Sequence, residues 1–162
     1  MVTARRGGGP TCDVIGLPSA RPEDIGALLD CVDAFCLHAG ISEGDAFDLR
    51  LAIEEVCTNV MMHGYTQQRP GPLEVSLCAD DENVTVVISD RAEPFDPGAA
   101  PVPDLETPAE QRQVGGLGWH LVRKMVDRIV YRYDVTDGNT VTLIKRLRMQ
   151  SETQVDGGRS DR

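Results

Sequence analysis

The sequence predicts an α+β domain, a two-layer sandwich in which three helices cover one face of a mixed, mostly antiparallel sheet. Three observations predict it: two apolar repeats of helical period in the first third, two alternating apolar segments in the middle, and an Asp-Gly turn between two more alternating segments near the end. A chain of 162 residues has the size of one ordinary domain.

The first half predicts one strand and two helices. Residues 11–17 form a short, partly apolar segment that predicts an edge strand. Apolar residues at three- and four-residue steps predict a helix over residues 22–40. Ser42 with Asp45 three residues later resembles a capping box, so we expect a second helix over residues 42–63.

The second half predicts four strands and one helix. Alternating apolar residues indicate strands at 73–77 and 84–88. Residues 91–114 hold five of the ten prolines and show no periodicity, which predicts a long irregular loop. A helical pattern follows over residues 117–128, and the Asp-Gly turn predicts a hairpin over residues 129–147.

The chain ends and the overall charge limit the function classes. Residues 1–10 and 149–162 are polar and glycine-containing, so we expect disordered tails around one domain of residues 11–148. The formal net charge of -10 repels nucleic acid and anionic lipid, so we expect neither to be bound directly. No apolar segment is long enough for a membrane span and no signal-peptide pattern occurs, so we expect a cytoplasmic protein.

The cysteine pattern predicts neither a set of disulfides nor a zinc site. There are five, without a Cys-x-x-Cys pair and without a histidine at zinc-ligand spacing. We therefore expect reduced, mostly buried thiols.

Glu55 and Asn59 lie four residues apart in the second predicted helix, and thus one turn apart on one face. A carboxylate and an amide in this arrangement could hold Mg²⁺, which prefers oxygen ligands, and activate a hydroxyl group. Taken alone, such a pair more often marks a solvated polar helix face.

Two further motifs suit a nucleotide. Asp90 follows a predicted strand, where its carboxylate can accept a hydrogen bond from the exocyclic amino group of adenine. A Gly-Gly-Leu-Gly segment opens the third predicted helix, where amides and the helix dipole can approach phosphates. No Gly-Lys-Ser/Thr follows it, and the dinucleotide-binding fingerprint is not matched. Each motif alone is weak, since acidic turns and glycines are common in loops.

In this order and spacing, the three motifs resemble the N, G1 and G2 boxes of the GHKL, or Bergerat-fold, ATP-binding superfamily. Within it, the segments Glu55-Val-Cys-Thr-Asn59, Pro94-Phe95-Asp96-Pro97 and Gly-Gly-Leu-Gly are similar to those of the anti-sigma-factor serine kinases. The resemblance spans about residues 13–147 and implies a Bergerat fold that binds ATP and Mg²⁺.

The resemblance implies roles for single residues. Glu55 matches the catalytic base that takes the proton from a substrate serine, Asn59 matches the Mg²⁺ ligand, and Asp90 matches the adenine-recognising aspartate. Residues 97–114 correspond to a lid over ATP. Four consecutive residues match the segment whose amides contact the phosphates: Gly115, Gly116, Leu117 and Gly118.

Two other positions complete the expected site. Thr142 on the last strand matches a hydroxyl group near adenine. Ala92 stands two residues after Asp90, where the family usually has glycine. Alanine is small enough to lie close to adenine, but a positive φ at that position would strain its backbone.

The resemblance also implies partners: a STAS-domain anti-anti-sigma protein as the kinase substrate and a sigma factor as the sequestered protein. Proteins of this family usually act as dimers, so a homodimer is also expected. The alternative is a nucleotide-binding, non-catalytic adaptor that controls a partner phosphatase. The ATPase part of a histidine kinase is disfavoured because no dimerisation helix with a phospho-accepting histidine occurs, and an α+β domain without a ligand remains open.

Overall fold

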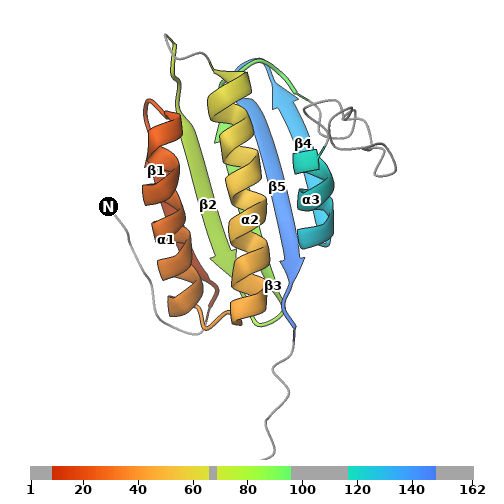
Figure 1. The fold of residues 1–162 in the computed structure, drawn as a ribbon. Helices are drawn as coiled ribbons and strands as arrows, with labels where there is room; N and C mark the ends of the chain where they lie inside the picture. Colours follow the sequence, from red (N-terminus) through yellow and green to blue (C-terminus); the bar gives the residue numbers. More distant parts are fainter. Residues whose placement is uncertain (1–8, 66–68, 96–116, 149–162) are drawn as a thin grey trace, which may run out of the picture.

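The computed structural model describes residues 9–65, 69–95 and 117–148, in which helices α1, α2 and α3 lie on one face of a five-stranded sheet (Figure 1). The strands are β1 (Thr11–Leu17), β2 (Leu73–Ala79), β3 (Asn83–Asp90), β4 (Arg128–Asp134) and β5 (Gly138–Arg146). The helices are α1 (Ile25–His38), α2 (Glu43–Asn59) and α3 (Leu117–Met125), with a 3₁₀ turn at Pro22–Asp24 and a π-helical turn at Val60–Gly64.

The strand order is β1-β2-β3-β5-β4, and every pairing among the described strands is antiparallel. The predicted α+β sandwich is therefore confirmed. Residues 1–8 of the predicted tail 1–10, the whole predicted tail 149–162 and the whole predicted lid 97–114 lie outside the described residues.

The start of α2 follows from its cap. Ser42 Oγ accepts a hydrogen bond from the Asp45 backbone N–H at 3.2 Å, which satisfies an otherwise unpaired donor of the first turn. Leu49, Ile53 and Val56 recur at helical spacing and are fully or almost fully buried against the sheet. The predicted continuation to residue 63 takes π-helical rather than α-helical geometry.

The third helix ends three residues earlier than the periodicity predicts. Its last α-helical residue is Met125, and β4 already begins at Arg128. The Asp127 backbone N–H donates to the Ile144 carbonyl at 2.9 Å, while Asp127 Oδ2 accepts from the Arg146 N–H at 2.7 Å. Because β5 binds both the backbone N–H and the side-chain carboxylate of Asp127, the chain joins the sheet before another helical turn can form.

The expectation of five reduced thiols is wrong. Cys12 and Cys78 form a disulfide between β1 and β2, where the two residues lie directly opposite each other in the strand register. Of the other three, Cys31 is exposed, and Cys36 and Cys57 are buried. Burial raises the pKa of Cys36 to about 11 and raises the pKa of Cys57 even further, so both thiols stay protonated at neutral pH.

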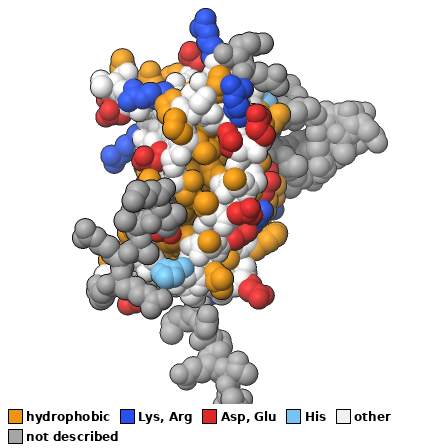
Figure 2. All heavy atoms as spheres, turned by 90° about the vertical axis from the view of Figure 1, so that its left-hand side faces the viewer, with side chains coloured by type: hydrophobic (Ala, Val, Ile, Leu, Met, Phe, Trp, Pro, Cys, Tyr) orange, Lys and Arg blue, Asp and Glu red, His pale blue; other side chains and the backbone are white. Residues whose placement is uncertain are grey.

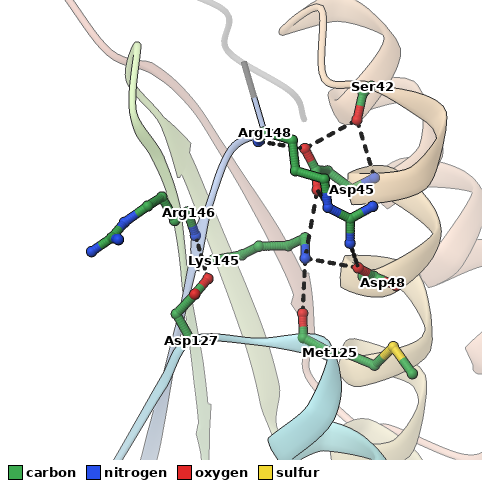
Figure 3. A network of polar contacts seen from close by, with 8 residues as sticks. All are labelled: Ser42, Asp45, Asp48, Met125, Asp127, Lys145, Arg146 and Arg148. Carbon is green, nitrogen blue, oxygen red and sulfur yellow. Dashed lines mark hydrogen bonds and ion pairs between the residues drawn. The ribbon is translucent and has the colours of Figure 1, made fainter. Parts of the chain in front are cut away.

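A charged network joins the start of α2 to the ends of α3 and β5 (Figure 3). Lys145 is only 5% exposed and donates to Asp48 at 2.8 Å and to the Met125 carbonyl at 3.0 Å. Arg148 donates its backbone N–H to Asp45 at 3.0 Å and its side chain to Asp48 at 2.7 Å. Burial raises the pKa of Asp45, but the hydrogen bond from Arg148 and the neighbouring charges outweigh it and hold that pKa below its usual range.

Figure 2 shows the side of the molecule on which α1 and β1 lie, where hydrophobic side chains gather between charged ones. Among the described residues, β1 pairs only with β2, so its outer edge is open, and its Val14 is 49% exposed. In the described part of the chain, no helix combines the length and the apolarity that crossing a membrane requires.

Candidate functional site

A cavity of about 380 Å³ lies between the end of α2, the start of α3 and the edge of the sheet where β3 ends. This volume is within the range of small-molecule sites. Of the residues predicted from the sequence, Asn59, Asp90 and Ala92 line it. The structure thus brings Asn59 close to Asp90 and Ala92, although Asn59 lies 31 residues before Asp90 in the chain.

Asp90 is the buried acid of this cavity, with an exposed fraction of 5%. Its Oδ1 accepts from the Asn139 amide and from the Ala92 backbone N–H, both at 2.8 Å. Burial raises the pKa of Asp90, and these two hydrogen bonds partly oppose the shift. Among the described residues, no hydrogen bond reaches Oδ2, so one carboxylate oxygen is left for a ligand.

Asn139 is a site residue that the sequence analysis missed. It lies directly opposite Asp90 in the pairing of β3 with β5, and its side chain is buried in the wall of the cavity. Gly138 allows this approach: its φ is +84°, and a Cβ there would collide with the Asp90 carbonyl oxygen. The Asp-Gly turn signal could have pointed to the next residue, but only the strand register pairs it with Asp90.

The strain expected at Ala92 does not occur. No non-glycine residue in the described part of the chain has a positive φ, so Ala92 adopts an ordinary backbone conformation. Its methyl group lies over Gly64, where a Cβ would come within 2.7 Å of the Ala92 Cβ. Gly64 therefore makes room for the side chain that replaces the family's usual glycine.

Glu55, Asn59 and Gly118 meet where α2 packs against α3. A Cβ on Gly118 would overlap with Glu55 Oε2 and would lie 3.7 Å from Asn59 Nδ2. The Asn59 Nδ2 is buried and has no hydrogen-bond partner within the described residues. Glu55 itself is half-buried and is not part of the cavity wall as the described residues define it.

The remaining predicted residues differ in position. Leu117 is the first residue of α3, which places its backbone at the positive end of the helix dipole. Gly115 and Gly116 lie outside the described residues. Thr142 is half-buried, and its neighbours along β5, Val141 and Leu143, are buried under the helices. Because side chains alternate along a strand, Thr142 points to the face without helices, away from the cavity that Val141 lines.

An aromatic pair borders the cavity. The rings of Phe95 and Trp119 are stacked, with centroids 6.1 Å apart and an angle of 29° between their planes. Trp119 is 3% exposed, whereas Phe95 is 52% exposed. Since both residues line the cavity, Trp119 is close enough to sense a bound ligand.

A magnesium ion fits the residues that are present. Mg²⁺ in phosphate-binding sites usually has one or two protein ligands and takes its other ligands from phosphates and water. The Asn59 amide lies next to the start of α3, and its unpartnered nitrogen leaves it able to turn its oxygen inward. Glu55, one turn earlier, adds a carboxylate nearby.

The chain is similar in sequence to known proteins over most of its length. Residues 18–145 match the family model described as a histidine kinase-like ATPase domain. The serine-protein kinase RsbW of Bacillus licheniformis is 28% identical over 144 residues, covering 86% of each chain. The RsbW of Staphylococcus epidermidis is 32% identical over 121 residues, covering 70% of this chain and 73% of the relative.

The fold also has a solved counterpart. The crystal structure of the RsbU and RsbW domains of a Mycobacterium tuberculosis protein aligns with a TM-score of 0.58 and 19% identity. The alignment covers 83% of this chain and 32% of the solved one. At this identity the likeness establishes the fold.

Proposed function

Because the chain belongs to the histidine kinase-like ATPase family and, within it, to the RsbW serine-protein kinases, we propose that it binds ATP in the cavity beside Asp90 and transfers the γ-phosphoryl group to a partner's serine. The observation that carries the proposal is that Glu55, Asn59 and Gly118 meet where α2 packs against α3, and that Asn59 also lines the cavity together with the buried Asp90. One oxygen of the Asp90 carboxylate accepts no hydrogen bond from the described residues.

The adenine end of the site is Asp90. Its Oδ1 is already bound by two donors, so the remaining oxygen accepts the exocyclic amino group of adenine. Guanine carries a carbonyl oxygen at that place, which would face the carboxylate without a donor, and the site therefore prefers ATP to GTP. Ala92 and Asn139 border the base.

The phosphate end is the start of α3. Here the amides of Gly115, Gly116, Leu117 and Gly118 are the donors we assign to the phosphates. The absence of a side chain on Gly118 and the positive end of the helix dipole favour close approach of the anion. Asn59 would hold Mg²⁺, which would neutralise phosphate charge.

Glu55 acts as the general base. The serine hydroxyl of the partner attacks the γ-phosphorus, its proton passes to the Glu55 carboxylate, and ADP leaves with the electron pair of the broken bond. The contact between Gly118 and the Glu55 carboxylate keeps the base beside the phosphate-binding segment. Positioning supplies most of the catalysis in such a reaction.

The partners that we propose are a STAS-domain anti-anti-sigma protein as substrate and a sigma factor as the sequestered protein, with a homodimer as the acting form. No direct contact with nucleic acid is part of the proposal, since a net charge of -10 opposes it. The action would take place in the cytoplasm.

The test is phosphoryl transfer from γ-labelled ATP to the serine of a cognate STAS protein. Wild-type protein should label the serine, and Glu55→Ala should do so about 100-fold more slowly while it still binds Mg-ATP, as expected for the loss of a general base. A tight complex with the STAS protein but no label would instead support the non-catalytic adaptor. Ala92 has no positive φ, so the backbone strain expected there does not oppose nucleotide binding.

A further inference from the structure

The amide of Asn139 is held by partners on both of its sides. Its Nδ2 donates to Asp90 Oδ1 at 2.8 Å and to the Ala92 carbonyl at 3.0 Å. Its Oδ1 accepts from the Tyr131 hydroxyl at 2.8 Å. Because two acceptors lie on one side and a donor on the other, only one of the two orientations of the amide is satisfied.

The direction of the Tyr131 hydroxyl is fixed as well. The backbone N–H of Phe95 donates to the Tyr131 oxygen at 3.1 Å, so the hydroxyl proton is directed to Asn139. A chain of hydrogen bonds therefore runs from Phe95 through Tyr131 and Asn139 to Asp90. All four residues line the same cavity, and they come from three different strands and the segment after β3.

We propose that Tyr131 is a positioning residue that sets base selectivity through Asn139. With the Tyr131 donor in place, Asn139 presents its amino group to Asp90 Oδ1 and leaves the other Asp90 oxygen for the base. Without that donor, the Asn139 amide is held only on its Nδ2 side, by Asp90 and Ala92, and its Oδ1 loses the Tyr131 hydrogen bond. The amide can then shift, and the Asp90 carboxylate bound to it would move from the position in which it discriminates adenine from guanine. The inference rests on the proposed function.

The alternative is a structural role, in which Tyr131 only stabilises the contact between the β4–β5 hairpin and Phe95. The structural role and the positioning role differ in what they predict for nucleotide selectivity. A fastening role changes stability and affects both nucleotides alike, whereas a positioning role changes the ratio of their affinities. Tyr133 is the matched control: it lies directly opposite Asn139 on the same strand as Tyr131, yet its side chain is 47% exposed and makes no hydrogen bond to the described residues.

The experiment is calorimetric titration of wild type, Tyr131→Phe and Tyr133→Phe with Mg-ATP and Mg-GTP. We expect Tyr131→Phe to lower the ATP-to-GTP affinity ratio by about fivefold to tenfold, the size of one lost hydrogen bond in a buried chain, and Tyr133→Phe to leave it unchanged. An unchanged affinity ratio in Tyr131→Phe, or an equal change in both variants, overturns the inference. If the wild type still binds ATP in that case, the proposed nucleotide site itself stands. Failure of the wild type to bind ATP overturns the proposed function itself.

A double variant tests whether Tyr131 acts through Asn139. If it does, adding Tyr131→Phe to Asn139→Ala should change the affinity ratio no further. Additive losses would mean that Tyr131 acts independently of Asn139, and would contradict the proposal. Thermal unfolding of each variant shows which of them are folded, and selectivity is compared among those.

Discussion

The contact between Gly118 and Glu55 makes Gly118→Ala the sharpest test of how the base is positioned. A methyl group on Gly118 would overlap with Glu55 Oε2, and the next nearest atoms, Glu55 Cδ at 3.5 Å and Asn59 Nδ2 at 3.7 Å, are at ordinary van der Waals distances. The atom that must move is the end of a flexible side chain, so the fold can yield at little cost. The substitution therefore displaces the carboxylate and leaves the backbone amide of residue 118 in place.

The size of the effect follows from the overlap. The Glu55 carboxylate must retreat by about 1 Å to restore van der Waals distance, and a misplacement of that size can cost about 100-fold in rate. Stability should change by less than about 1 kcal/mol, because alanine favours a helix over glycine by about that amount and offsets the adjustment of Glu55. ATP binding should weaken by less than about threefold, since no phosphate donor is lost.

The assay combines single-turnover phosphoryl transfer with nucleotide binding followed by fluorescence of Trp119, the only tryptophan of the chain, which lines the cavity. Gly26→Ala is the matched control, because Gly26 is also helical and has nothing within 4 Å of an added Cβ. Transfer by Gly118→Ala at the wild-type rate, or equal rate losses in both variants, would refute the assignment of Glu55.

Three further changes test other parts of the account. Burial raises the pKa of Asp90, and adenine needs the ionised carboxylate, so ATP affinity should fall on acidification at a pH above the ordinary aspartate value of about 3.9; calorimetry over pH measures this. Cys78→Ser should lower the free energy of unfolding in urea by roughly 4 kcal/mol, because the disulfide to Cys12 spans a sequence separation of 66. Lys145→Met should cost about 3 kcal/mol in the same assay because it removes the buried ammonium group from Asp45 and Asp48, which keep only their contacts with Arg148 and Ser42. Arg148→Met, with a side chain that is 65% exposed, should cost less than about 1 kcal/mol.

Each of these has its own control and its own contrary result. The affinity of Asp90→Asn should lack the acid-dependent loss; if it follows the wild-type curve, ATP phosphates or another group titrate instead. Wild type in reductant should match Cys78→Ser, and equal stability of oxidised and reduced protein would remove the disulfide from the stabilising contacts. Equal losses in Lys145→Met and Arg148→Met would contradict the importance of burial in that network.

The sequence predicted the elements whose signals are local. Helical periodicity located α1 and α2, the Ser42 cap fixed the start of α2, and alternation located the strands. The three motifs were enough to bring Asn59 and Asp90 to one cavity, because the family order implies how helix and strand ends converge.

The features that it did not predict depend on strand register. The pairing of Cys12 with Cys78 and that of Asp90 with Asn139 follow from which residues lie opposite each other, and no local pattern contains that information. The case of Thr142 is different, because its alternation with apolar neighbours already indicated the face away from the helices. The early end of α3 arises from tertiary capture of Asp127 by β5.

The most direct test of the central claim is isothermal titration of the purified protein with ATP, with and without Mg²⁺, and with GTP as the comparison. The account predicts saturable binding of one ATP per chain, strengthened by Mg²⁺ and clearly weaker for GTP. No binding, or equal binding of both nucleotides, would contradict the assignment of the cavity beside Asp90 as an adenine nucleotide site.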